Sequence, residues 1–257
     1  MTMPGEMRAD LPRRVSCVIP AYNEAPRIAR VLAAVLGHPL VDEVIVVDDG
    51  SHDGTAEVVA GIGGARLIRL TQNGGKTAAV AEGVAAARHD LVMLLDSDLL
   101  GLDAHHLSAL IAPVLEGAAD VSISLRRNAP LPWRLIGLDY ISGERVLSRQ
   151  HLGDLAALRN LPRFGLEVHM NRFWIARRLR VAVVCWPEVE SPFKSAKHGA
   201  WQGLWADLRM LRDMFRTVPL HRATAQIWAL RRQRVKPVPE LRDGRKIPTQ
   251  TVPGAVK

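Results

Sequence analysis

The stretch LVMLLDSD, residues 91–98, is a short apolar run that ends in two carboxylates. Continuous apolar runs of this length are typical of strands that are covered on both faces of a parallel sheet. Side chains alternate along a strand, so Asp96 and Asp98 should point to one side and Ser97 to the other. Mg²⁺ and Mn²⁺ prefer oxygen ligands and often bind only one or two protein carboxylates, which makes Asp96 and Asp98 candidate metal ligands.

Strand and helix patterns alternate on both sides of this stretch. Strands are expected at Val15–Pro20, Glu43–Asp48, Arg66–Leu70, Asp90–Leu95 and Asp120–Leu125, and helices at Ala25–Leu36, Thr55–Ile62, Lys76–Arg88 and Ala104–Glu116. This order predicts an open, mostly parallel α/β sheet with helices on both faces. Such sheets bind ligands beyond the carboxyl ends of their strands, so the residues that follow each strand are the candidates for a site.

Carboxylates follow three of the expected strands. They are Glu24, Asp48, Asp49, Asp96 and Asp98. Aspartate is common after strands because it forms turns and caps helices, and for Asp53 this explanation is the stronger one. Turn chemistry alone does not require carboxylates at three successive crossovers, so the set as a whole indicates a binding site.

The composition is globular, and the charge is divided unevenly along the chain. Of 257 residues, 48% are hydrophobic and 23% charged, and the two cysteines are too few for a disulfide framework, which favours a reducing compartment. No apolar run reaches the length of a membrane span or of a signal peptide. Residues 1–171 hold 16 Lys and Arg against 20 Asp and Glu, whereas residues 172–257 hold 18 against 6. The basic part is expected to meet an anionic partner, which could be membrane lipid, nucleic acid or a phosphorylated substrate.

Four segments resemble, in order and spacing, the motifs of family-two inverting glycosyltransferases with the GT-A fold. They are VSCVIPAYNEAPRI, VIVVDDGSHDGT, QNGGKTAAVAEG and VMLLDSDLL. Further along, residues 120–126, 141–145 and 164–168 resemble segments of polyprenyl-phosphate sugar synthases. The resemblance implies a nucleotide-sugar donor, Mg²⁺ or Mn²⁺ as cofactor, and a GT-A fold that is followed here by an amphipathic C-terminal helix and a basic tail.

On the donor side, the resemblance implies contacts with the nucleotide sugar from Pro20, Ala21, Tyr22, Glu24, Asp49, Lys76, Asp96, Ser97 and Asp98. Asp49 would read the base or the ribose, and Asp96 and Asp98 would hold the metal and the diphosphate. Leu100 stands where the synthases often have a glutamine. One metal contact is therefore missing, and Glu167 is a candidate substitute.

On the acceptor side, the expected residues are basic. Arg126 and Arg145 match arginines of the synthases and would bind an acceptor phosphate, since a guanidinium engages two oxygens at once. Ser142 would lie beside them. Lys194 and Lys197, on a basic flap, would meet the donor diphosphate or the acceptor phosphate.

Residues 200–234 have the pattern of an amphipathic helix. Its apolar face comprises Trp201, Leu204, Trp205, Leu208, Leu211 and Phe215. Two tryptophans flanked by arginines suit a membrane interface, but the face could equally pack on its own domain or on a second subunit of a homodimer. The chain is thus expected to divide into an N-terminal extension (1–13), a nucleotide-sugar half (14–126), an acceptor-side half (127–199), this helical appendage (200–234) and a flexible basic tail (235–257).

The sequence therefore predicts a metal-dependent inverting glycosyltransferase that moves a hexose from a UDP- or GDP-sugar to a lipid-linked phosphate. Its place would be the cytoplasmic face of a membrane with an anionic surface. The expected catalytic residues are Asp98, Glu167, Arg126 and Arg145. One alternative is transfer to a glycan or glycolipid hydroxyl, with Glu167 as base. A non-catalytic nucleotide- or RNA-binding protein is an alternative of another class, disfavoured by the paired aspartates and by the lack of interleaved aromatic residues that RNA binding needs.

Overall fold

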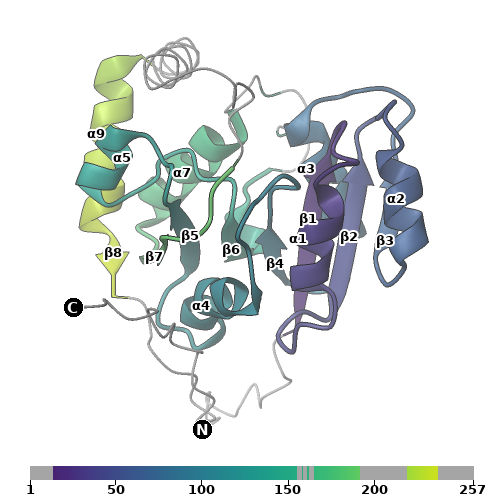
Figure 1. The fold of residues 1–257 in the computed structure, drawn as a ribbon. Helices are drawn as coiled ribbons and strands as arrows, with labels where there is room; N and C mark the ends of the chain where they lie inside the picture. The colour runs from purple at the N-terminus through teal and green to yellow at the C-terminus, as the bar shows by residue number, and fades with distance from the viewer. Residues whose placement is uncertain (1–13, 155–157, 159–160, 162–164, 192–218, 237–257) are drawn as a thin grey trace, which may run out of the picture.

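The computed structural model describes residues 14–154, 158, 161, 165–191 and 219–236, and within these ranges it contains one mixed sheet (Figure 1). Its strands are β1 (Val15–Ala21), β2 (Glu43–Asp48), β3 (Arg66–Arg69), β4 (Leu91–Leu94), β5 (Val121–Arg126), β6 (Arg145–Ser148), β7 (Val181–Trp186) and β8 (Arg234–Val235). The helices are α1 (Ile28–Val35), α2 (Thr55–Ile62), α3 (Lys76–Ala86), α4 (Ala104–Leu115), α5 (Leu131–Ile136), α7 (Gly165–Arg177) and α9 (Leu220–Arg232), with a 3₁₀ turn at Arg149–His151.

The direction in which strands are added to the sheet reverses next to β1. The order is β3-β2-β1-β4-β6-β5-β7-β8, in which β1 pairs in parallel with both β2 and β4. Only β6 runs antiparallel to its neighbours β4 and β5 among the strands described. The chain moves outward from β1 to β3 and then returns to β4 on the other side of β1. In sheets of this kind ligands bind beyond the carboxyl ends of the strands at such a reversal, which here are β1 and β4. The expected open, mostly parallel α/β architecture is confirmed.

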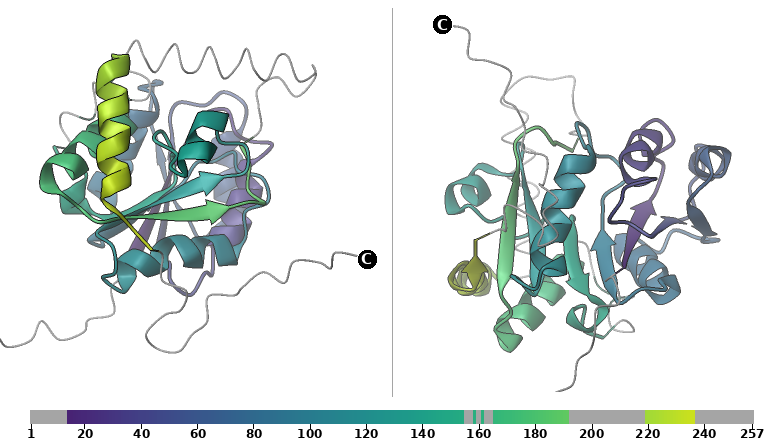
Figure 2. Two further views of the ribbon diagram at one scale, coloured as in Figure 1. Left: turned by 90° about the vertical axis from the view of Figure 1, so that its left-hand side faces the viewer. Right: turned by 90° about the horizontal axis from the view of Figure 1, so that it is seen from below.

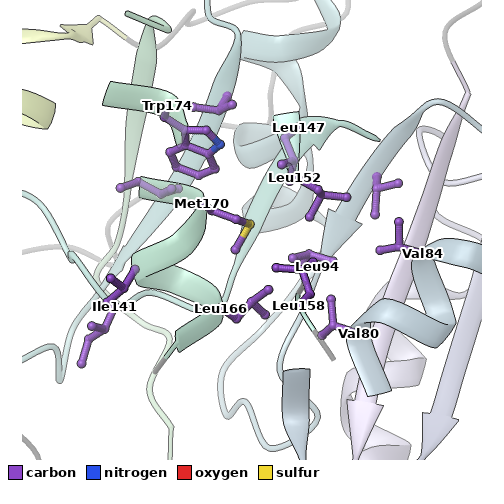
Figure 3. Close-up of a cluster of buried hydrophobic side chains, with 14 of the residues drawn as sticks. Val80, Val84, Leu94, Ile141, Leu147, Leu152, Leu158, Leu166, Met170 and Trp174 are labelled. Carbon is purple, nitrogen blue, oxygen red and sulfur yellow. The ribbon is translucent and has the colours of Figure 1, made fainter. Parts of the chain in front are cut away.

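Two buried apolar clusters lie on the two faces of the sheet. One includes residues of α1 and α4, and the other residues of α3, α7 and α9 (Figure 2). Along β1, Cys17 and Ile19 belong to the first cluster and Val18 to the second, as the alternation of a strand requires. In the second cluster, Val80 of α3 and Trp174 of α7 are among the side chains drawn in Figure 3. Both faces are therefore covered, which explains why the strand sequences are continuously apolar.

A glycine sets the distance between α3 and the sheet. A Cβ atom at Gly83 would lie 2.4 Å from Cγ1 of Val18 and 3.0 Å from Cγ2 of Val47. Only a residue without a side chain allows the helix to approach β1 and β2 this closely. The close contact helps to place Lys76, at the first turn of the same helix, beside the carboxyl edge of the sheet.

The C-terminal part of the described chain differs from the expected appendage and tail. The buried residues of α9 are Ala223, Ile227 and Leu230, and all three belong to the cluster that includes α7. The chain then adds β8 in parallel to β7, so Val235 is part of the sheet and not of a flexible tail. The apolar face from Trp201 to Phe215, like residues 1–13, lies outside the described residues. No helix in the described ranges is long and apolar enough to cross a membrane.

Candidate active site

The carboxyl ends of β1 and β2 are tied to the loop that precedes α3. The backbone amide of Asp49 donates a hydrogen bond to the carbonyl of Ala21 at 2.8 Å. The buried carboxylate of Asp49 accepts hydrogen bonds from the amides of Gly74 and Gly75, each at 2.8 Å. Burial raises the pKa of Asp49, and the two amides oppose this shift. Asp49 thus fixes the loop that leads directly to Lys76.

The other donor-side residues of the first motif lie at the same edge. Pro20 and Ala21 are buried at the end of β1, whereas Tyr22 keeps 43% of its surface exposed. The carboxylate of Glu24 accepts a hydrogen bond from Nε of Arg27 at 2.5 Å. The ring of Tyr22 is therefore accessible at this edge, while Glu24 is held by a neighbouring cation.

A lysine bridges two carboxylates at the centre of the edge. Nζ of Lys76 lies 2.7 Å from Oδ1 of Asp96, just beyond β4, and 3.2 Å from Oε1 of Glu167 on α7. Burial alone would lower the pKa of Lys76, but the charges of Asp96 and Glu167 raise it above its ordinary value. Although burial opposes it, the charges of Lys76 and Arg126 hold the pKa of Asp96 below its ordinary range. Lys76 and Asp96 are therefore both charged at neutral pH.

Asp98 experiences the opposite effect from its surroundings. Burial, and then the negative charges of Asp96 and Glu24, raise the pKa of Asp98 to about 6. Ser97, between the two aspartates, is buried. A carboxylate whose charged form is disfavoured by neighbouring carboxylates is stabilised when a cation binds beside it.

Asp96 and Asp98 offer carboxylate oxygens, which are suitable ligands for a hard divalent cation. A Cβ atom at Gly143 would lie 2.5 and 2.6 Å from the two carboxylate oxygens of Asp96 and 2.7 Å from Nζ of Lys76, so this glycine keeps the space beside them open. The described residues hold no group of three or more His, Cys, Asp or Glu side chains arranged for a metal ion. Mg²⁺ and Mn²⁺ commonly take one or two carboxylates plus substrate phosphates, so a bound diphosphate would supply the remaining ligands.

Two buried carboxylates beneath the site were missed by the sequence analysis. Asp139 and Glu144 are fully buried and face Arg126. Nη2 of Arg126 lies 4.0 Å from Oδ2 of Asp139, and its Nη1 lies 3.5 Å from Oε1 of Glu144. Ser124 donates a hydrogen bond to Oε2 of Glu144 at 2.6 Å. Burial raises the pKa of Asp139 to about 6, and Arg126 opposes this shift. Glu144 could have been predicted from the sequence, because it directly precedes Arg145, which matches an arginine of the synthases.

Arg126, at the end of β5, interacts electrostatically with Asp96 and Asp98. Burial alone would lower its pKa, but Glu144, Asp139 and the site aspartates raise it, so the guanidinium stays charged. Its charge in turn lowers the pKa values of Asp96 and Asp98. The structure thus brings Arg126 together with the candidate metal ligands.

Arg145 and Ser142 lie in the interior, which does not fit the expected contact with an acceptor. Both are fully buried. Nε of Arg145 donates a hydrogen bond to the Ser142 carbonyl at 2.7 Å and Nη1 donates to Oδ1 of Asn171 at 2.8 Å, while the guanidinium lies 4.9 Å from the ring centroid of Trp174. Burial lowers the pKa of Arg145. These contacts make Arg145 a support for the turn that carries Gly143.

The remaining expected residues are placed as follows. Glu167 contacts Lys76 and is almost completely buried. Leu100 forms a backbone bridge with Glu190 and contributes no oxygen side chain to the site. Lys194 and Lys197 lie outside the described residues. The described part of the site is therefore an edge where acidic and basic side chains alternate.

Known proteins are similar to this chain in sequence and in fold. Residues 16–178 match the family model described as glycosyl transferase family 2. A crystal structure of glucosyl-3-phosphoglycerate synthase from Mycobacterium tuberculosis with Mn²⁺, uridine diphosphate and phosphoglyceric acid superposes with a TM-score of 0.62 at 25% identity, over 84% of each chain. That enzyme's curated sequence is 35% identical over 158 residues, 57% of this chain and 48% of the relative.

A second kind of relative is an undecaprenyl-phosphate 4-deoxy-4-formamido-L-arabinose transferase from Aeromonas hydrophila. It is 38% identical over 128 residues, which are 46% of this chain and 39% of the relative. The matched part thus spans less than half the length of these curated relatives. The family model covers more than half of this chain, and the fold agrees with the motifs. The chain belongs to glycosyl transferase family 2.

Proposed function

We propose that this protein transfers a hexosyl group from a nucleotide-activated sugar to an acceptor phosphate carried by a membrane lipid, with Mg²⁺ or Mn²⁺ as cofactor. The observation that carries the proposal is the group of alternating charges formed by Lys76, Asp96, Glu167 and Arg126 at the carboxyl edge of the sheet. A diphosphate leaving group is anionic, and an edge that offers both cations and metal-binding carboxylates is suited to receive it.

The donor would bind between the first, second and third motifs. The exposed ring of Tyr22 would contact the base, and the loop fixed by Asp49 would approach the phosphates from the side of Lys76. We favour a uridine nucleotide, because structures of the M. tuberculosis relative contain uridine diphosphate or UDP-glucose. GDP is the other candidate for the nucleotide.

The cation would be held by Asp96 and Asp98 together with the diphosphate. Its chemistry would be to neutralise the charge that develops on the departing nucleoside diphosphate. Lys76 would add a second positive charge on the protein side. Glu167 and Asp96 hold the lysine ammonium in place before the donor binds, so little reorganisation is needed.

The acceptor would approach from the side of Arg126. A phosphate oxygen would attack the anomeric carbon of the hexose as the bond to the nucleotide diphosphate breaks, which inverts the anomeric configuration. A phosphate is already anionic at neutral pH, so this reaction requires positioning by Arg126 more than a general base. The relative that carries undecaprenyl phosphate in its name supports this acceptor class.

A second candidate is transfer to the hydroxyl of a small phosphorylated acceptor. It is favoured by the crystal structures of the M. tuberculosis relative with phosphoglyceric acid. A hydroxyl acceptor needs a base, and Glu167 is the candidate, although Oε1 of Glu167 lies 3.2 Å from Lys76.

Radiolabelled UDP-glucose and GDP-mannose, with Mn²⁺, would separate these functions. Each donor is offered with undecaprenyl phosphate in detergent or with 3-phosphoglycerate in buffer, and the label is followed into the organic or the aqueous phase. The proposal predicts label in the lipid fraction. Label only in the phosphoglycerate product would establish the second candidate, and no transfer or hydrolysis with either donor would contradict both.

A further inference from the structure

Large apolar side chains are exposed mainly on two neighbouring helices. In the part of the chain that is described, six large hydrophobic residues are exposed, and four of them lie on α5 and α9. On α5, Leu131 is 58% exposed and Leu135 is 78% exposed. On α9, Leu220 and Trp228 are each 58% exposed. We call these four residues the α5–α9 patch; concentrations of apolar surface of this kind mark interaction sites.

The two helices lie side by side at one end of the sheet. Both views in Figure 2 and the view in Figure 1 place α5 and α9 at the β7–β8 end of the molecule. The hydroxyl of Tyr140 donates a hydrogen bond to Oε1 of Gln226 on α9 at 2.5 Å. A Cβ atom at Gly137, the residue after α5, would lie 3.0 Å from Nη1 of Arg234. The segment that follows α5 thus lies against α9 and β8, and this places the two helices of the patch beside each other.

The charged residues of α5 and α9 themselves have one sign only. Helix α5 contains Arg134 and no acidic residue, whereas Arg127, before the helix, lies 4.0 Å from a carboxylate oxygen of Glu190. Residues 219–236, which include α9, contain no acidic residue. Their basic residues are Arg222, Arg231, Arg232, Arg234 and Lys236. Lys and Arg therefore outnumber the acidic residues on these two helices, so the surface that they form is basic. An anionic partner complements it.

Trp228 has the surroundings of an interfacial tryptophan. The guanidinium carbon of Arg231 lies 5.2 Å from the centroid of its ring. The opposite side of α9 is buried against the domain through Ala223, Ile227 and Leu230, so the exposed side of α9 is a separate face. A helix that joins an exposed indole to arginines and lacks acidic residues is suited to lie in the headgroup region of a bilayer.

We propose that the α5–α9 patch docks the protein on an anionic lipid surface. Helix α5 begins five residues after Arg126, the last residue of β5, so the patch is connected to the acceptor side of the proposed site. The bilayer would thus lie on the acceptor side of the site, where a lipid-linked phosphate would enter. In this respect the inference deepens the proposed function, but the docking itself requires neither donor nor acceptor.

Co-sedimentation with vesicles tests the docking directly. The full chain is mixed with vesicles of phosphatidylcholine alone or of phosphatidylcholine with phosphatidylglycerol. A Leu135→Ser, Trp228→Ala double variant is compared with wild type and with Ile62→Ser, which alters an exposed residue of α2 away from the patch. We expect binding to the anionic vesicles only, a loss of at least about tenfold in the double variant, and no change in Ile62→Ser.

Three results would overturn the inference. The first is that the wild type does not bind the vesicles, and the second is that the double variant binds them as well as the wild type does. The third is that, in sedimentation without lipid, the wild type is a dimer and the double variant a monomer. The last result would assign the patch to a second copy of the chain. Hydrolysis of UDP-glucose, measured without lipid in all variants, reports separately on the proposed function, so failure of one is distinguishable from failure of the other.

Discussion

The ammonium of Lys76 lies 2.7 Å from a carboxylate oxygen of Asp96, although one residue opens a helix and the other follows a strand. Asp96 comes to this position because the strand order reverses between β1 and β4. Lys76 comes to it because Gly83 lets α3 lie close to the sheet. The pair therefore depends both on the strand order and on the close packing of α3 against the sheet.

Lys76→Ala should impair donor use more than folding. Removal of a charge-assisted contact to a diphosphate costs about 1.5–3 kcal/mol, which corresponds to a roughly ten- to hundredfold lower kcat/KM for UDP-glucose. The matched control is Arg69→Ala, which removes an exposed cation that pairs with Glu57. Steady-state kinetics check the prediction, and equal losses in the two variants would contradict a specific role for Lys76.

Gly143→Ala should abolish activity without unfolding the protein. The added Cβ atom would lie within 2.7 Å of Lys76 and of both carboxylate oxygens of Asp96, so it should displace these side chains. We expect a loss of at least about a hundredfold in kcat, of the size seen when one electrostatic contact is removed from an active site. Gly61→Ala is the control, because a Cβ atom there would meet nothing within 4 Å. A fully active Gly143→Ala protein would show that this space is not part of the site.

Arg126 and Arg145 should respond differently to removal. Arg126→Ala should raise the acceptor KM about tenfold or more with little change in the donor KM, whereas exposed Arg127→Ala should change neither. Arg145→Ala should instead lower the free energy of unfolding by about 3–5 kcal/mol, because its buried partners lose a charged donor. Kinetics and urea denaturation measure the two effects. If Arg145→Ala were as stable as the wild type and only its acceptor KM were raised, the assignment of Arg145 to a structural role in the interior would be wrong.

The buried Asp139 should give stability a specific pH dependence. Its pKa is raised to about 6 by burial, so the folded protein binds a proton more tightly than the unfolded chain does. Stability from this group is therefore present at low pH and is lost as pH rises from about 4 to about 6, by at most about 3 kcal/mol. The side-chain amide in Asp139→Asn does not titrate, so this variant lacks the pH dependence that comes from Asp139. Its unfolding free energy relative to wild type should rise over this range in urea denaturation at a series of pH values, and a constant difference would refute the assignment.

The motifs predicted the sheet and its carboxyl edge because they depend on local patterns. The strand at residues 91–94 was predictable from a short apolar run, but Asp96 and Asp98 lie beyond its end, where the expected alternation of a strand does not apply. The buried position of Arg145 was not predictable, because an arginine that matches a motif can point into the protein or out of it. The same holds for β8, whose two residues become a strand only because β7 offers a free edge. Long-range packing decides such cases, and short sequence patterns do not encode it.

The central claim is that Asp96 and Asp98 hold a divalent cation against the diphosphate of the donor. Isothermal titration of UDP and of GDP, with Mn²⁺ or with EDTA, tests it most directly in wild type, in Asp98→Ala and in Asp90→Ala at the other end of the β4 segment. We predict that Mn²⁺ strengthens binding of one nucleotide at least about tenfold in wild type and Asp90→Ala, and that Asp98→Ala loses this gain. Equal nucleotide affinity with and without Mn²⁺ in the wild type, or an undiminished Mn²⁺ effect in Asp98→Ala, would contradict the claim.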